Sequence, residues 1–391
     1  MSFFRRAGDT APSPASAIAE FWAWWARARP RIEAAGFTDR PPGDSAPNEP
    51  DASDASRAAA PDAPDAAAAE APGAADAAVP APGAADGGLS GELIEEISGR
   101  VAAIRPELQW EISGAPGAAA FTLSGGGAGE LRGICERWRR AAPPTEGWTF
   151  HAARRAEPEL LRRRLSLGDH EFDLGYVRLG MRADPNRARV HLSVYHPDFL
   201  FVAEEARRQV AANVLVWALG EDDVARWIGE VTIATEQPVD ALPPDTLGAV
   251  VAQIAEPFKE PTWLRGEGRT PRGHPAQVAV LFPLHRQDHP LCDLHVAVSL
   301  PYANSNPDRL PVAPSSTALK AFQEKLSGFG AHAVLALSET GDGLRVFHLY
   351  ADPDSGVVAE LDQLAAEWPE GRARVAAAPD PAWRTLTPYQ P

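Results

Sequence analysis

Four side chains with the chemistry of zinc ligands fall within a short stretch of the chain: His285, His289, Cys292 and His295. Imidazole nitrogen and thiolate sulfur are donors that zinc prefers, and Pro290 could turn the chain so that they converge. A metal-dependent enzyme is therefore one hypothesis. We favour a structural role, because His295 begins an alternating strand over residues 294–300 and no Cys-x-x-Cys pair accompanies it. From this pattern we assign no catalytic residue, no metal ligand and no cofactor.

A glycine-rich run, Gly125-Gly126-Gly127-Ala128-Gly129, separates an expected strand from an expected helix. Backbone amides at the start of a helix can bind an anion. The run lacks the Gly-x-Gly-x-x-Gly spacing, and no Lys followed by Ser or Thr comes after it. We therefore expect a flexible loop in place of a phosphate site.

Two further groups of polar residues invite a chemical interpretation. Asp169, Glu171 and Asp173 would share one strand face, but Leu174 stands where an EF-hand loop needs glycine, so we expect a solvated strand edge. His191 and His196 flank the end of a strand before a proline, and we expect interior or edge residues there in place of a catalytic pair. Nucleophile-elbow, zinc-protease and Walker motifs are absent from the sequence.

Composition divides the chain into folded and unfolded parts. The 391 residues are 45% apolar and carry a formal charge of -16, which suffices for two or more cores. Residues 41–88 hold 19 Ala, 9 Pro, 9 acidic residues and one Arg, so they predict a disordered linker. Because this linker carries half of the net charge, the remainder is only mildly acidic. That balance argues against general binding to nucleic acid or to an anionic membrane.

The cellular location is predicted from cysteine use and from apolar runs. Two cysteines are too few for a disulfide framework, and the first residues lack the apolar run of a signal peptide. No window approaches 18 uninterrupted apolar residues, so no segment is expected to span a membrane. We expect a cytoplasmic protein.

An aromatic helix is expected in residues 1–40. Apolar side chains recur there at helical spacing, Ser16 can cap the helix, and Pro30 should kink or end it. The cluster Phe21-Trp22-Ala23-Trp24-Trp25 is too apolar to face water. We favour docking of this helix on the chain's own fold, with a partner-binding or membrane-surface helix as the alternative.

A central α+β domain is expected over residues 89–257. Helical periodicity covers residues 93–104 and 131–138, and strand patterns fall near 108–112, 119–123 and 148–151. Further strands are expected between residues 165 and 195, before a long helix that Gly220 should end. Glu221-Asp222-Asp223 then places carboxylates at the start of another helical turn.

A second α+β domain is expected over residues 262–391. Asp342-Gly343 is a strong two-residue turn signal between strands at 333–337 and 344–350, which should pair antiparallel. Helices are expected at 317–326 and 357–368, followed by a last extended segment. A ferredoxin-like layout, with both helices on one face of an antiparallel sheet, is our expectation for this domain.

Several stretches resemble one bacterial family, domain of unknown function 695: the C-terminal run from Gly341 to Asp352 with Asp380-Pro381-Ala382-Trp383, the block from Leu219 to Gly229, and Tyr195-His196-Pro197. The resemblance implies the fold but carries no catalytic pattern. We therefore expect a non-catalytic binding or regulatory protein that acts through protein–protein contacts. The alternatives are the metal-dependent enzyme named above and an immunity-type protein that masks a basic partner.

The linker assignment is directly testable. Under dilute broad-specificity protease, residues 41–88 should be cut well before the domains on either side, because exposed structureless backbone is the preferred site of cleavage. Mass spectrometry of the first fragments would locate the cuts. First cuts inside residues 89–257 or 262–391 would contradict the assignment.

Overall fold

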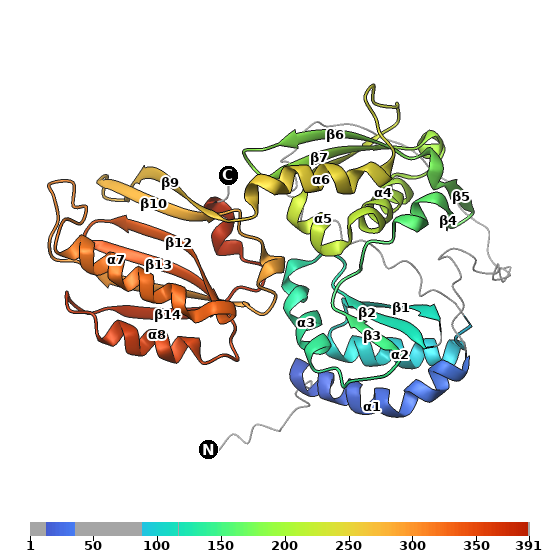
Figure 1. The fold of residues 1–391 in the computed structure, drawn as a ribbon, viewed down its shortest axis with the longest axis horizontal. Helices are drawn as coiled ribbons and strands as arrows, with labels where there is room; N and C mark the ends of the chain where they lie inside the picture. The colour runs from blue at the N-terminus through green and yellow to red at the C-terminus, as the bar shows by residue number, and fades with distance from the viewer. Residues whose placement is uncertain (1–12, 36–87, 116, 390–391) are drawn as a thin grey trace, which may run out of the picture.

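The chain is a mixed α+β protein whose elements form three packed units (Figure 1). The computed structural model describes residues 13–35, 88–115 and 117–389. The expected linker therefore lies almost entirely outside the described residues. Among the described helices, none is long and apolar enough to cross a membrane.

The N-terminal unit packs helices against one small sheet. Its sheet has the order β1-β2-β3, with β1 antiparallel and β3 parallel to β2. One apolar cluster joins helices and sheet. The elements are α1 (Pro14–Ala35), α2 (Gly91–Ile104), β1 (Gln109–Ala115), β2 (Ala118–Ser124), α3 (Arg132–Arg140) and β3 (Trp148–His151).

Helix α1 is docked on this unit, which confirms the expectation of internal docking. Phe21, Trp22 and Trp25 are buried among aromatic rings of the sheet, and the Trp25 ring meets Trp148 edge-on at 4.8 Å. The helix begins at Pro14, so the expectation that Ser16 caps it was wrong. Of the two outcomes expected at Pro30, a kink or an end, the helix does not end there and continues to Ala35. A proline in a helix removes one hydrogen bond, but buried apolar side chains lie on both sides of it, with Ala28 before it and Ile32 after it.

The middle unit contains the strands expected between residues 165 and 195 and the long helix expected before Gly220. A hairpin, β4–β5, stands beside a sheet of order β6-β7-β8, in which β8 runs parallel to β7. Gly220, with a φ of 81°, ends α4 as predicted, and the acidic run Glu221-Asp222-Asp223 opens α5. The elements are β4 (Arg164–Leu167), β5 (His170–Asp173), β6 (Arg178–Asp184), β7 (Arg189–Tyr195), α4 (Glu204–Leu219), α5 (Glu221–Trp227), β8 (Ile228–Ala234) and α6 (Leu247–Ala255).

The residues of the expected central domain thus divide between two apolar clusters. Residues up to Ala152 pack with α1, whereas residues from Leu161 to Val251 form a cluster of their own.

The C-terminal unit is one six-stranded antiparallel sheet with the order β14-β11-β13-β12-β10-β9. The predicted turn joins β12 to β13, and both Asp342 and Gly343 have positive φ, as a primed hairpin turn requires. The elements are β9 (Thr262–Arg269), β10 (Pro275–Phe282), β11 (Leu294–Pro301), α7 (Ser315–Leu326), β12 (Ala333–Gly341), β13 (Leu344–Ala351), α8 (Val357–Ala366) and β14 (Arg374–Pro379).

The two faces of this sheet are covered differently. Helices α7 and α8 pack on one face, against side chains such as Phe347 and Leu349 (Figure 1). On the opposite face, Trp383 and Leu386 of the C-terminal segment pack against Tyr350. The element order from β11 to β14 is β-α-β-β-α-β, the order of ferredoxin-like motifs. The hairpin β9–β10 extends that core by two strands.

Replacing Trp25 by Ala should destabilise the protein by about 3–5 kcal/mol, because a fully buried ring would leave a cavity among aromatic neighbours. Chemical unfolding measures the change. The control is Arg27→Ala on the exposed side of α1, which should stay within about 0.5 kcal/mol of the parent protein. Equal stability of the two variants would contradict the docking of α1.

Candidate functional site

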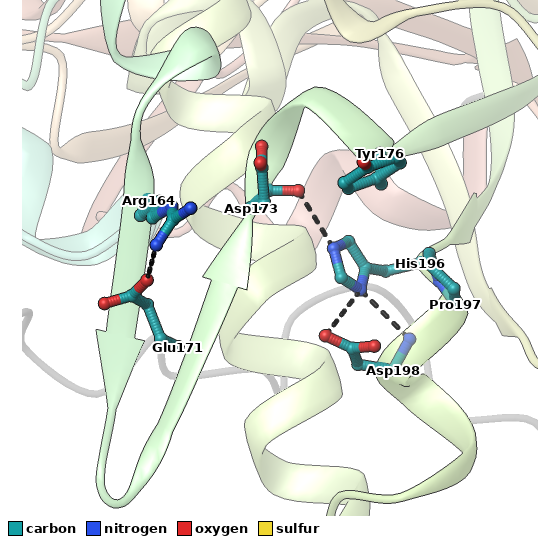
Figure 2. A pocket seen from close by; sticks show the side chains of 7 residues that line it. All are labelled: Arg164, Glu171, Asp173, Tyr176, His196, Pro197 and Asp198. Carbon is teal, nitrogen blue, oxygen red and sulfur yellow. Dashed lines mark hydrogen bonds and ion pairs between the residues drawn. The ribbon is translucent and has the colours of Figure 1, made fainter.

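A hollow of about 390 Å³ opens on the surface of the middle unit (Figure 2). It is built where the β4–β5 hairpin meets the turn after β7. The β4–β5 register places Arg164 opposite Asp173, and Pro197 starts a short 3-10 helix directly after the strand end. The lining residues are Arg164, Glu171, Asp173, Tyr176, His196, Pro197 and Asp198.

His196 stands between two segments of the hollow and is 1% exposed. Its Nε2 lies 3.0 Å from the carbonyl oxygen of Asp173, and its Nδ1 lies 3.1 Å from the backbone nitrogen of Asp198 (Figure 2). The backbone N–H of Asp198 donates to Nδ1, so Nε2 carries the proton and donates to the carbonyl. Both ring nitrogens are therefore occupied within the protein. The ring clamps the two segments together and has no free nitrogen to act as a base.

The carboxylates of the hollow differ in how they are neutralised. Arg164 and Glu171 form an exposed ion pair across the hairpin at 2.6 Å. Among the described residues, the side chain of Asp173 accepts one hydrogen bond, which the backbone N–H of Gly175 donates. Asp198 lies 3.2 Å from His170 and keeps about a third of its side chain exposed. Two carboxylates thus face the hollow without an arginine or lysine partner among the described residues.

Large apolar side chains are exposed in this part of the middle unit. Tyr176, which lines the hollow, is 59% exposed. Leu200, the last residue of the short helix, and Phe201, which follows it, are 61% and 80% exposed. The ring of Tyr176 stands 6.5 Å from the imidazole of His196, which places it beside the hollow. Exposed aromatic rings next to polar groups are characteristic of interaction surfaces. The sequence did not reveal these exposed side chains, although Tyr195-His196-Pro197 closely precedes two of them.

The glycine-rich run does bind an anion, but the anion belongs to the protein itself. The backbone N–H of Gly127 donates to Glu221 at 2.9 Å. The Ser124 hydroxyl and the backbone N–H of Arg154 donate to the same carboxylate at 2.6 and 3.1 Å. The run precedes a helix, as predicted, and the first residue of α5 fills the place that an external phosphate would need.

Ion pairs continue from this point across the boundaries of all three units. Arg132 of α3 binds Asp222 of α5 through two hydrogen bonds of 2.9 and 3.0 Å. Arg137 of α3 and Arg286 of the C-terminal unit both bind Asp293. Burial raises the pKa of Asp293 although both guanidinium groups oppose this.

The structure separates the four residues of the zinc-type pattern. His285 packs against Trp227, and burial lowers its pKa to about 4. His289 stacks on Trp383, while the Cys292 thiol faces the carbonyl of His332 and burial raises its pKa to about 11. Within the part of the chain that the structure describes, no three His, Cys, Asp or Glu side chains gather as metal ligands.

His295 has a partner that the sequence did not reveal. Its Nε2 lies 3.0 Å from Nδ1 of His348 on the neighbouring strand, and Nε2 of His348 lies 3.3 Å from Glu339. The hydroxyl of Tyr389 donates to the same glutamate at 2.6 Å. Burial, and next the neighbouring His348, lower the pKa of His295. This chain of contacts fastens the C-terminal segment to the open face of the sheet.

The remaining predicted residues hold structural positions. Asp169 lies in the β4–β5 turn, so the expectation that it shares a strand face with Glu171 and Asp173 was wrong. His191 accepts the backbone N–H of Glu230 at 3.1 Å, on a different strand pair from the contacts of His196. The two histidines therefore do not form a pair.

Comparisons of the chain with protein-family models, with curated proteins and with solved structures found no match.

Replacing Glu221 by Gln should destabilise the protein by about 2–4 kcal/mol, because an amide supplies one acceptor oxygen where three donors converge. Thermal and chemical unfolding measure the change. Glu230→Gln, at an exposed position on β8, is the matched control and should shift stability by less than about 0.5 kcal/mol. A Glu221 variant as stable as its control would show that the carboxylate does not hold the glycine-rich run.

Proposed function

We propose that this protein is a non-catalytic binding or regulatory protein that acts through protein–protein contacts. The observation that supports this most is the hollow of the middle unit, where the exposed ring of Tyr176 adjoins two carboxylates that form no ion pair with an arginine or lysine among the described residues. A protein surface of this kind gains free energy both from burying apolar area and from pairing its charges.

The chemistry of the hollow favours binding over catalysis. A general base needs a nitrogen or oxygen that can reach a substrate proton. Both nitrogens of His196 are already engaged by backbone groups. We accordingly infer that the imidazole shapes the hollow and that Tyr176 and Asp198 make the contacts.

The partner that fits this surface is a basic segment of another protein. Asp173 and Asp198 offer two negative charges, and the aromatic face of Tyr176 can receive an arginine or lysine side chain. Leu200 and Phe201 would cover the aliphatic parts of neighbouring partner residues. The same surface would serve an immunity-type protein that masks a basic partner, which is the second function that this observation supports.

We further propose that the C-terminal unit is a ferredoxin-like domain extended by β9 and β10. The strand order β14-β11-β13-β12 and the placement of α7 and α8 on one face support this. Membership of the domain of unknown function 695 family remains a proposal that rests on the sequence resemblance. A cytoplasmic location rests on the two buried, unpaired cysteines.

A labelled short peptide of alternating arginine and leucine is a suitable probe of the hollow. It should bind the full chain, and the double variant Tyr176→Ala with Asp198→Asn should weaken binding about tenfold, which corresponds to about 1.4 kcal/mol. Fluorescence anisotropy at physiological ionic strength measures both affinities, and added salt should weaken the binding to the parent protein.

The matched control removes one exposed apolar side chain and one carboxylate elsewhere, through Leu264→Ala with Asp362→Asn. This control should bind the peptide as the parent protein does. If both double variants bind the peptide equally weakly, the binding depends on the overall negative charge of the protein and the proposal is overturned. The proposal is also overturned if the peptide does not bind the parent protein.

A further inference from the structure

A second hollow, of about 280 Å³, lies on the C-terminal unit and carries the opposite charge. Its lining residues are Ser299, Pro301, Leu344, Arg372 and Arg374. They come from β11, β13 and β14 together with the segment that leads into β14.

Strand register brings these residues together on the face of the sheet opposite to helices α7 and α8. Ser299 stands directly opposite Arg374, and Pro301 stands opposite Leu344. Directly paired residues point to the same face of a sheet. Val298 and Leu300, the alternate residues of β11, are buried beneath the helices. The side chains of the hollow therefore point away from α7 and α8.

One wall of the hollow is fixed by close packing. The indole N–H of Trp368 donates to the carbonyl of Pro301 at 2.7 Å. A Cβ on Gly371 would come within 3.0 Å of the Pro301 ring, and the φ of Gly371 is 117°. Only glycine allows the chain to pass this close in that conformation. The close contact between Gly371 and Pro301 fixes the backbone position of the next residue, Arg372, which lines the hollow.

The two arginines of the hollow form no ion pair with the part of the chain that the structure describes. Arg137, Arg226 and Arg286 each bind at least one carboxylate. By contrast, neither Arg372 nor Arg374 has a hydrogen-bond acceptor or an ion-pair partner among the described residues, and both are exposed. Two guanidinium groups that converge on one hollow repel each other, and an anion between them removes that repulsion.

Small side chains continue this face toward β14. Ala297 pairs with Ala376 one row further along, while on β13 Val346 stands opposite Ser299 and His348 opposite Ala297. Ala376 is exposed, so the face is open there to an apolar group.

We propose that this hollow binds a small organic anion. Arg372 and Arg374 hold its phosphate or carboxylate group, the Ser299 hydroxyl donates a further hydrogen bond, and the apolar body of the ligand lies over Ala297 and Ala376. The site is separate from the acidic hollow of the middle unit and does not depend on the function proposed for that hollow.

Phenyl phosphate and phenylacetate are the two probes, because each joins an oxyanion to an apolar body, and 2-phenylethanol is the neutral control. Titration calorimetry on the full chain should detect one or both anions and not the alcohol. The double variant Arg372→Gln with Arg374→Gln should lose at least about tenfold in affinity, the scale of one to two charge-assisted hydrogen bonds.

Two further variants make the test specific. Arg265→Gln removes an exposed arginine from the same sheet, and it should bind as the parent protein does. Ser299→Leu fills the hollow while keeping both arginines, and it should abolish binding with the melting temperature unchanged. Binding of the alcohol as tightly as the anions, equal losses in the double variant and the Arg265 variant, or no binding of either anion would overturn the proposal.

Discussion

The arrangement of the three units depends on one buried carboxylate. Glu221 is the first residue of α5 in the middle unit, yet its donors are Ser124, Gly127 and Arg154, which lie on the chain before that unit begins its hairpin. A charge taken out of water is costly unless hydrogen bonds replace its hydration. Three donors and the N-terminus of α5 supply that replacement. The two units must therefore keep this relative position for the charge to remain satisfied.

The neighbouring ion pairs fix the position of the third unit, the C-terminal unit, in the same way. Helices α3 and α5 lie at the centre of the molecule, where the units meet (Figure 1). Arg132 pairs with Asp222, Arg226 with Asp288, and Arg137 with Asp293, so each pair crosses a boundary between units. Partly buried charges of this kind favour one arrangement, because breaking a pair leaves its partner without compensation.

The charged residues at the boundaries between the units therefore have a structural role, in contrast to the charged residues that are available to ligands. The carboxylates and guanidinium groups along the boundaries satisfy one another. The charges that line the two hollows lie away from these boundaries, with Asp173 and Asp198 in the acidic hollow of the middle unit and Arg372 and Arg374 in the basic hollow of the C-terminal unit. The two hollows have opposite charge and lie on different units, so they suit different ligands. The exposed ring of Tyr176 at the first favours a protein partner, and the two arginines beside Ala297 and Ala376 at the second favour a small anionic ligand.

Local rules of the sequence determined most of the elements. The alternation of side chains between the two faces and the turn residues Asp342-Gly343 were enough to predict the β12–β13 hairpin. The geometry of such a turn requires these residue types, whatever surrounds them. Gly220 sufficed for the end of α4, since glycine adopts positive φ without strain. Aromatic spacing in residues 18–32 likewise predicted a helix that could not face water, although the pattern could not identify the surface on which it docks.

Contacts between distant residues were decided only by the tertiary structure. Glu221 meets the glycine-rich run from 94 residues away, and Arg374 meets Ser299 only through the pairing of β11 with β14. His295 has His348 as its partner, not the histidines that precede it in the chain. Sequence spacing predicts which side chains share one helix or strand, because the backbone geometry repeats. It does not predict which elements become neighbours, because that depends on how all the apolar faces and charges are satisfied together.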